Sequence, residues 1–171
     1  MLHIAQSLGS SKEKVVESFD KMTTENELMR RKFRILVNKF SDNMAESVSQ
    51  KAIKLRSGLK IYGTYDDEIG YDYHIALGEK STDNDPFLVY VALVQEQERI
   101  KVIVFVGVES RKIIKASRIA KEISLKLGGT GGGGTEKFAQ GGGKDKSKVH
   151  ECLENLENLL TSILDSSEKN G

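Results

Sequence analysis

The feature that most constrains the fold is a long stretch near the N-terminus that contains neither proline nor glycine. It runs from Ser10 to about Arg56. Ser10 stands three residues before Glu13, which is the spacing of a helix capping box. One helix of roughly 45 residues would be about 65 Å long. A short helix over residues 2–8, ending at Gly9, is expected before it.

Apolar residues recur along this stretch at alternating spacings of four and three. Such a stripe is typical of a helix that packs against another long helix, and a polar residue on it can fix register and partner number. No second long helix is expected in the chain, so the expected partner is another copy. The alternative is that the helix folds back on the rest of the chain. The predicted dimer interface is Phe19, Met22, Asn26, Met29, Phe33, Leu36 and Phe40.

Gly58 is expected to begin a second domain, which divides the chain into a helical subdomain (1–57) and a globular one (58–171). The predicted elements are strand 59–65, a short helix within 67–80 interrupted by Gly70, strands 87–94 and 100–106 joined by a hairpin turn, a helix over 111–127 capped by Ser110 and stopped at Gly128, a glycine-rich loop over 128–143, and a final helix capped by Ser147. This order, β-α-β-β-α with a glycine-rich loop and a C-terminal helix, predicts an α/β globular domain preceded by a long-helix subdomain.

Charge is strongly segregated along the chain, although the formal net charge is only +1. Residues 66–98 hold 1 basic and 9 acidic side chains, a net of −8, whereas residues 99–126 hold 8 basic and 2 acidic ones, a net of +6. This polarity is typical of a protein with one anion-facing surface. The alternative is that the opposite charges face one another inside the fold.

The glycine-rich segment holds nine of the 16 glycines, between Gly128 and Gly143. Glycine lets backbone N–H groups approach an anion closely, as in phosphate-binding nests. Composition alone would also fit a flexible linker, but Phe138 and its neighbours would anchor the middle of the segment. A nucleotide site is not predicted, because the G-x-G-x-x-G match follows a helix and the P-loop pattern fails at Asp145.

The helix predicted over 111–127 carries a basic face opposite its apolar arc. A charged outer face is ordinary for a helix, but its place directly before the glycines favours phosphate binding. The cations of this face are Arg111, Lys112, Lys115, Arg118, Lys121 and Lys126.

Other functional classes lack the residues that they need. The single cysteine, Cys152, allows no intrachain disulfide and fits a reducing cytoplasm. The three histidines are far apart in sequence, so neither a zinc site nor a nucleophile–base set is predicted. No apolar run approaches the ~20 residues of a membrane span. The acidic group at 66–72 is explained as a solvated helix start.

The segment Ala139-Gln140-Gly141-Gly142-Gly143-Lys144-Asp145, after the run Gly131 to Gly134, resembles a signature near the C-terminus of alanyl-tRNA synthetases. The same small domain accompanies DHH-type phosphoesterases, where its glycine-rich loop contacts substrate. One departure is that Thr135-Glu136-Lys137-Phe138 stands where many relatives carry an Arg-Pro pair, so Lys137 is the only substitute for that guanidinium.

The resemblance implies that the chain is a fragment that dimerises its enzyme and contacts the elbow of alanine tRNA. The parent ligase would use ATP, Mg and zinc in the cytoplasm, but the fragment itself is expected to hold no cofactor, metal or catalytic residue and to meet no membrane. The alternative is the substrate-binding domain of a DHH-type phosphoesterase. The expected RNA-binding residues are Arg111, Lys112, Lys115, Arg118, Lys121, Gly131, Gly132, Gly133, Gly134, Lys137, Gln140 and Lys144.

Overall fold

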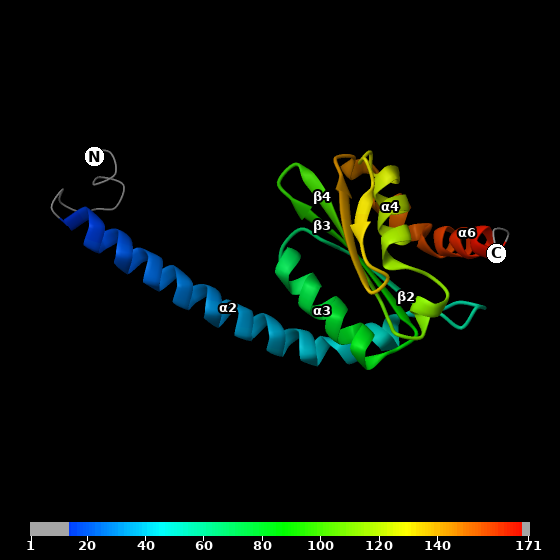
Figure 1. Cartoon of the computed structure of the whole chain (residues 1–171), viewed down its shortest axis with the longest axis horizontal. Helices are drawn as coiled ribbons and strands as arrows, with labels where there is room; N and C mark the ends of the chain where they lie inside the picture. Colours follow the sequence, from blue (N-terminus) through cyan, green and yellow to red (C-terminus); the bar gives the residue numbers. More distant parts are fainter. Residues whose placement is uncertain (1–13, 169–171) are drawn as a thin grey trace. The chain divides into compact units, whose positions relative to one another are not determined.

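The computed structural model describes residues 14–168 (Figure 1). The helix predicted over 2–8, its end at Gly9 and the capping box at Ser10 therefore lie outside the described residues. The chain divides into two compact units, Met1–Lys39 and Phe40–Gly171. The second unit thus begins within the long helix, earlier than the boundary expected after residue 57.

The long N-terminal helix is confirmed as α2, Val15–Lys51. It ends five residues before the predicted Arg56, because the chain turns back to pair strand β1 (Ile53–Lys54) with the next strand. Gly58 permits this turn with a φ of +88°, and the Leu55 N–H donates to the Leu59 carbonyl. The last turns of α2 belong to the second unit and pack within it: Ala45 and Val48 are buried, and Asp42 pairs with Lys80 at 2.9 Å.

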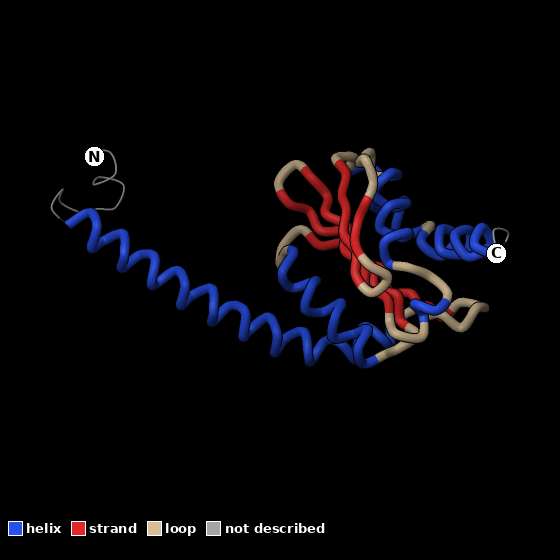
Figure 2. The backbone as a smooth tube through the Cα atoms, in the orientation of Figure 1, coloured by secondary structure: helices blue, strands red, loops and turns tan. Residues whose placement is uncertain are grey.

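A six-stranded sheet forms the centre of the second unit, in the order β1-β2-β3-β4-β6-β5 (Figure 2). The predicted strands are confirmed as β2 (Lys60–Asp66), β3 (Leu88–Glu96) and β4 (Arg99–Val106). Strands β2 and β3 are parallel, whereas β3 and β4 form the predicted antiparallel hairpin, with Gln97 at a φ of +53° in its turn. Seven consecutive residues of β3 are buried, as expected for a strand covered on both faces.

Helices cover the two faces of the sheet (Figure 1). Helix α3 (Tyr71–Asn84) contacts β3 and β4 on one face, and α4 (Ala116–Lys126) contacts β4 and the last two strands on the other. Helices α5 (Val149–Glu154) and α6 (Leu156–Glu168) complete the layer that contains α4. The main core lies on the α4 face, where Val91, Leu93, Val102, Val104, Ile119, Ile123, Leu156 and Leu160 pack together.

Three predicted helix boundaries are wrong. Gly70 does not interrupt a helix; it precedes α3 with a φ of +96°. Ser110 starts only a short 3₁₀ turn, η2 (Ser110–Lys112), and α4 begins at Ala116, where its first free N–H groups donate to carbonyls at Thr135 and Glu136. Asp145, not Ser147, caps the C-terminal segment through a second 3₁₀ turn, η3 (Lys146–Lys148), and that segment breaks at Asn155.

The glycine-rich segment is not a loop. It forms strands β5 (Gly132–Gly134) and β6 (Phe138–Gly143), which pair with each other, while β6 also pairs with β4. Most of its glycine backbone groups therefore belong to a sheet ladder. The expected α/β globular domain behind a long helix is nevertheless confirmed, with two more strands than predicted at this edge.

Candidate nucleic-acid interface

Glycine lets helix α4 lie directly on strands β5 and β6. A Cβ at Gly141 would overlap the Ser124 hydroxyl, and one at Gly143 would overlap the Leu127 carbonyl. The Ser124 Oγ in turn accepts the Gly142 N–H at 3.0 Å and donates to the Ala120 carbonyl at 2.6 Å. Backbone and helix are thus held together where side chains would force them apart.

A half-open cleft of about 550 Å³ lies at this edge of the sheet. Its wall is backbone from two glycine segments, Gly128–Gly131 and Gly141–Gly143, interrupted only by Thr130. Three of the residues that line the cleft are cationic, Arg99 and Lys101 of β4 and Lys144 directly after β6, and none is acidic. We call this feature the glycine cleft.

The glycine cleft gathers part of the predicted RNA-binding set. Gly131 and Lys144 line it, and the Lys121 side chain reaches its rim, 3.8 Å from where a Cβ on Gly131 would stand. Next to it, Gly132, Gly133 and Gly134 form β5, the edge strand, which has a strand on one side only within residues 14–168. An edge strand presents backbone donors and acceptors to an incoming partner.

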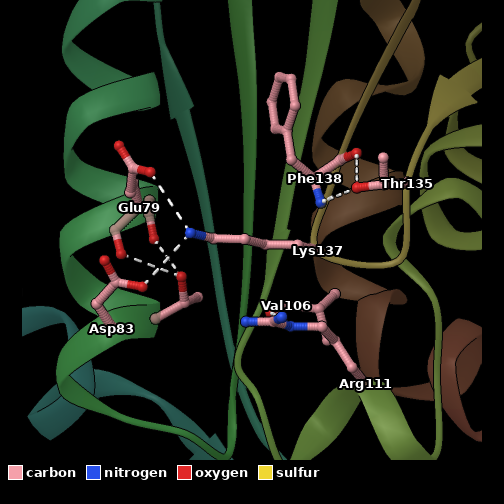
Figure 3. A network of polar contacts seen from close by, with 9 residues as sticks. Glu79, Asp83, Val106, Arg111, Thr135, Lys137 and Phe138 are labelled. Atoms are coloured by element: carbon pink, nitrogen blue, oxygen red, sulfur yellow. Dashed lines mark hydrogen bonds and ion pairs between the residues drawn. The ribbon is translucent and has the colours of Figure 1, made fainter.

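Lys137 and Gln140, also predicted to bind RNA, instead face helix α3. The Lys137 Nζ extends towards two carboxylates of α3, 3.5 Å from Glu79 and 3.6 Å from Asp83 (Figure 3). The Gln140 Oε1 accepts the Tyr71 hydroxyl at 2.6 Å. These contacts link β6 and the turn before it to α3.

Several cations of the predicted basic face are also bonded within the chain. The Arg111 Nε donates to the Val106 carbonyl at 2.9 Å (Figure 3), and the Arg118 Nη2 donates to the Ser166 hydroxyl at 2.7 Å. Lys112 pairs with Glu109 at 2.7 Å. Lys115, which precedes α4, and Lys121 are exposed. Of the cations that the helical periodicity selected, Lys121 thus lies beside the glycine strands.

Arg99 and Lys101 were missed because they belong to a buried-strand pattern, not to a basic helix. The available signal was the alternation of charged and apolar residues at the start of β4. Arg99 and Lys101 are exposed, whereas Ile100 and Val102 are buried. Only the pairing of Lys101 with Gly142 and of Ile100 with Gly143 brings these cations to the glycines.

The predicted dimer stripe is exposed on α2. Phe19, Met22, Met29, Phe33, Leu36 and Phe40 are each between 48% and 69% exposed. Asn26 is exposed as well. Phe40 differs from the rest, because its ring also packs against Tyr73 at 5.6 Å.

The acidic group at 66–72 is not simply a solvated helix start, which corrects the expectation. Asp66 is largely buried, and its carboxylate accepts the N–H groups of Glu68, Ile69 and Gly70. The His74 Nε2 lies 3.2 Å from it, without hydrogen-bond geometry, and the His74 Nδ1 shares a 2.6 Å hydrogen bond with the Tyr90 hydroxyl. Tyr90 is fully buried, so the His74–Tyr90 bond joins α3 to β3 inside the fold.

Within residues 14–168, no three His, Cys, Asp or Glu side chains gather as metal ligands would. Cys152 is buried, and burial raises the pKa of its thiol, which disfavours the thiolate. None of the helices in the same range has both the length and the apolar content to cross a membrane.

Together these features define a small α/β domain whose glycine-built sheet edge offers a cationic, backbone-lined surface. Residues 73–162 match the DHHA1 domain family, and the chain belongs to that family. The match takes in helices α4 and α5, the glycine strands and most of α3.

Comparisons with individual proteins agree with the resemblance seen in the sequence. The chain is 27% identical over 160 residues to an alanine–tRNA ligase of Rickettsia canadensis. The aligned part covers 94% of this chain but only 18% of the ligase, so the chain spans about a fifth of that relative's length. The fold is similar to the C-Ala domain of Aquifex aeolicus alanyl-tRNA synthetase, with a TM-score of 0.58 and 23% identity over 64% of this chain and 97% of that one. A RecJ from Thermus thermophilus, solved with Mg²⁺, shares the fold at a TM-score of 0.53 and 12% identity over 94% of this chain and 23% of that one.

Proposed function

We propose that this chain is the C-terminal domain of an alanyl-tRNA synthetase, which binds the elbow of alanine tRNA and dimerises the enzyme. It supports aminoacylation and editing by the rest of a cytoplasmic ligase that uses ATP, Mg and zinc. The observation that carries the tRNA-binding part is the glycine cleft, in a domain whose curated relatives are named alanine–tRNA ligases.

The chemistry of the glycine cleft suits a folded RNA backbone. Arg99, Lys101 and Lys144 supply charge for phosphates, and the glycine backbone allows a close approach without side chains in the way. The only aromatic residue of the glycine segment, Phe138, packs its ring on Phe105 at 4.7 Å. Stacking of several unpaired bases is therefore disfavoured, and recognition relies on shape, phosphates and 2′-hydroxyls.

The test compares three versions of the chain in titrations with alanine tRNA, a second tRNA and an unstructured RNA of equal length. The cleft variant carries Arg99→Ala, Lys101→Ala and Lys144→Ala. The matched control carries Lys51→Ala, Lys54→Ala and Arg56→Ala, which remove the same charge around β1, at the opposite edge of the sheet. Each titration is repeated across salt concentrations, because neutralised phosphates release counterions.

We expect the cleft variant to bind both tRNAs at least about tenfold more weakly, with a salt slope flatter by up to about three. The control variant should bind like the wild type, and the unstructured RNA should bind more weakly than either tRNA. Equal affinity for the unstructured RNA would contradict elbow recognition. An unchanged cleft variant would instead contradict the assignment of the glycine cleft.

A second candidate is the substrate-binding domain of a DHH-type phosphoesterase, which the shared fold with RecJ favours. The same titration separates the two functions. A phosphoesterase domain would bind short single-stranded nucleic acid at the glycine cleft as well as it binds tRNA, whereas an elbow-binding domain prefers the folded RNA.

A further inference from the structure

The apolar stripe of α2 has two defined ends. It starts at Val15 and stops at Phe40, because the next positions at the same spacing are the polar Asn43, Ser47 and Gln50. The stripe is therefore 26 residues long and nearly symmetric about its midpoint, between Glu27 and Leu28.

Resting on the dimerisation part of the proposed function, we propose that a second copy of this chain covers the stripe with its own α2 in antiparallel orientation. The two stripes then match from end to end. Val15 meets Phe40 of the second copy, Phe19 meets Leu36, and Met22 meets Phe33. Asn26 meets Met29 in the two central layers.

Side-chain size favours this orientation. Every phenylalanine then lies opposite a smaller Val, Leu or Met, so the layers have similar volumes and the helices can keep a constant separation. In a parallel pair, each of Phe19, Phe33 and Phe40 would face the same residue of the second copy. Layers of two phenylalanines would then alternate with layers of smaller side chains. Uniform interdigitation is what close packing requires.

The distribution of charge along α2 favours the same orientation. Residues 14–27 carry four acidic and two basic side chains, whereas residues 28–40 carry five basic side chains and no acidic one. A parallel pair would align the two basic halves along the same 13 residues. The antiparallel pair places each basic half beside the acidic half of the other copy.

The charges that flank the seam add to this argument, because only the antiparallel orientation gives Lys32 an acidic partner. Glu25 and Lys32 each directly precede a seam residue, Asn26 and Phe33, so both lie at the edge of the seam. In the antiparallel pair, Glu25 faces Lys32 of the second copy, twice by symmetry. In a parallel pair, Glu25 would face Arg30, and Lys32 would face the apolar Val37.

Disulfide cross-linking tests the orientation with seam residues, in a chain whose buried Cys152 is replaced by alanine. Phe19→Cys and Leu36→Cys are purified separately, then oxidised mildly alone and after mixing. We expect cross-linked dimers only in the mixture. Self-cross-linking of each variant alone would overturn the antiparallel orientation, because a parallel seam places each residue opposite itself.

Charge exchange tests the same arrangement without changing the apolar seam. Glu25→Lys and Lys32→Glu should each weaken self-association, and mixing the two variants should produce mostly mixed dimers in native mass spectrometry. A statistical mixture would contradict the pairing. Phe33→Asp serves as the monomer reference in sedimentation. A wild-type chain that is itself a monomer at tens of micromolar would refute dimerisation, while leaving the tRNA titrations to judge the rest of the proposed function.

Discussion

Asp66 and His74 lie side by side between β2 and α3, with Tyr62, Tyr73 and Tyr90 around them. Burial alone would raise the pKa of the Asp66 carboxyl, but three backbone N–H donors outweigh it and hold the pKa below its usual value. Burial lowers the pKa of the His74 imidazole, although Asp66 opposes this. The fold thus favours the neutral form of the His74 imidazole.

This cluster predicts a loss of stability in acid in two steps. The unfolded chain protonates His74 at its usual pKa of 6.5 while the folded chain does not, so the free energy of unfolding falls as the pH drops below that value. Asp66 adds a second loss below its usual pKa of 3.8, because only the unfolded chain takes up that proton at first. Urea unfolding between pH 8 and pH 3 measures both steps.

His74→Gln should lower stability at pH 7.5 and remove much of the first step. The matched control is His150→Gln, because His150 is exposed and merely lies near the Tyr65 ring. A control that flattens the pH dependence as strongly as His74→Gln would contradict the role of the buried histidine.

At the scale of the element, the strand pair β5–β6 and the turn before it show how one residue type serves two purposes. At Gly129 an added Cβ would overlap the Gly142 carbonyl, so this glycine is needed for packing. At Gly133 an added Cβ would meet nothing within 4 Å, and its backbone is not in the left-handed region. Gly133 is therefore open to solvent and to a ligand, and packing does not explain its identity.

These two positions predict opposite outcomes for the same substitution. Gly129→Ala should lower the free energy of unfolding by about 2 kcal/mol or more, because the backbone has to move to relieve the overlap. Gly133→Ala should change it by about 0.5 kcal/mol or less. Thermal unfolding followed by circular dichroism measures both, and equal effects would mean that the close approach of Gly129 to Gly142 is not required.

At the scale of the whole molecule, the segregated charges do two different things. Some acidic side chains of 66–98 neutralise cations within the fold, as Glu79 and Asp83 do for Lys137 and Asp85 does for Lys60 at 2.7 Å. The cations around the glycine cleft line it without any acidic side chain among them. Pairing within the fold thus accounts for part of the acidic side chains, and the cations at the glycine cleft remain the candidates for an anion-facing surface.

We predict that the chain alone catalyses neither aminoacylation, ATP hydrolysis, deacylation nor phosphodiester cleavage. The reason is that the Cys152 thiol is buried and that, within residues 14–168, no three His, Cys, Asp or Glu side chains gather as metal ligands would. Assays of all four reactions on the purified chain check this. Turnover that co-purifies with the wild type and persists through an added purification step would contradict it.

The sequence by itself determined the elements whose signal is local. The absence of proline and glycine predicted α2, and continuous apolar runs predicted β3 and β4, because backbone freedom and burial act on neighbouring residues. The run from Ala139 to Asp145 was enough to indicate the family. The helix start expected at Ser110 failed because the first N–H groups of α4 donate to carbonyls of Thr135 and Glu136, which are distant in sequence. The start expected at Ser147 failed because Asp145, two residues earlier, provides the cap.

Only the tertiary structure decided what the glycines do. Glycine carries no side chain to alternate between faces, so nothing local distinguishes a strand of glycines from a loop. Strand β6 forms because it pairs with β4, and β5 forms because it pairs with β6. At Gly132, Gly141 and Gly143, helix α4 or the residue that follows it also lies too close for a Cβ. That same pairing moves the candidate site from the basic helix to Arg99, Lys101 and Lys144. The reason is that cross-strand register sets which cations face the glycines, and no local pattern encodes this register.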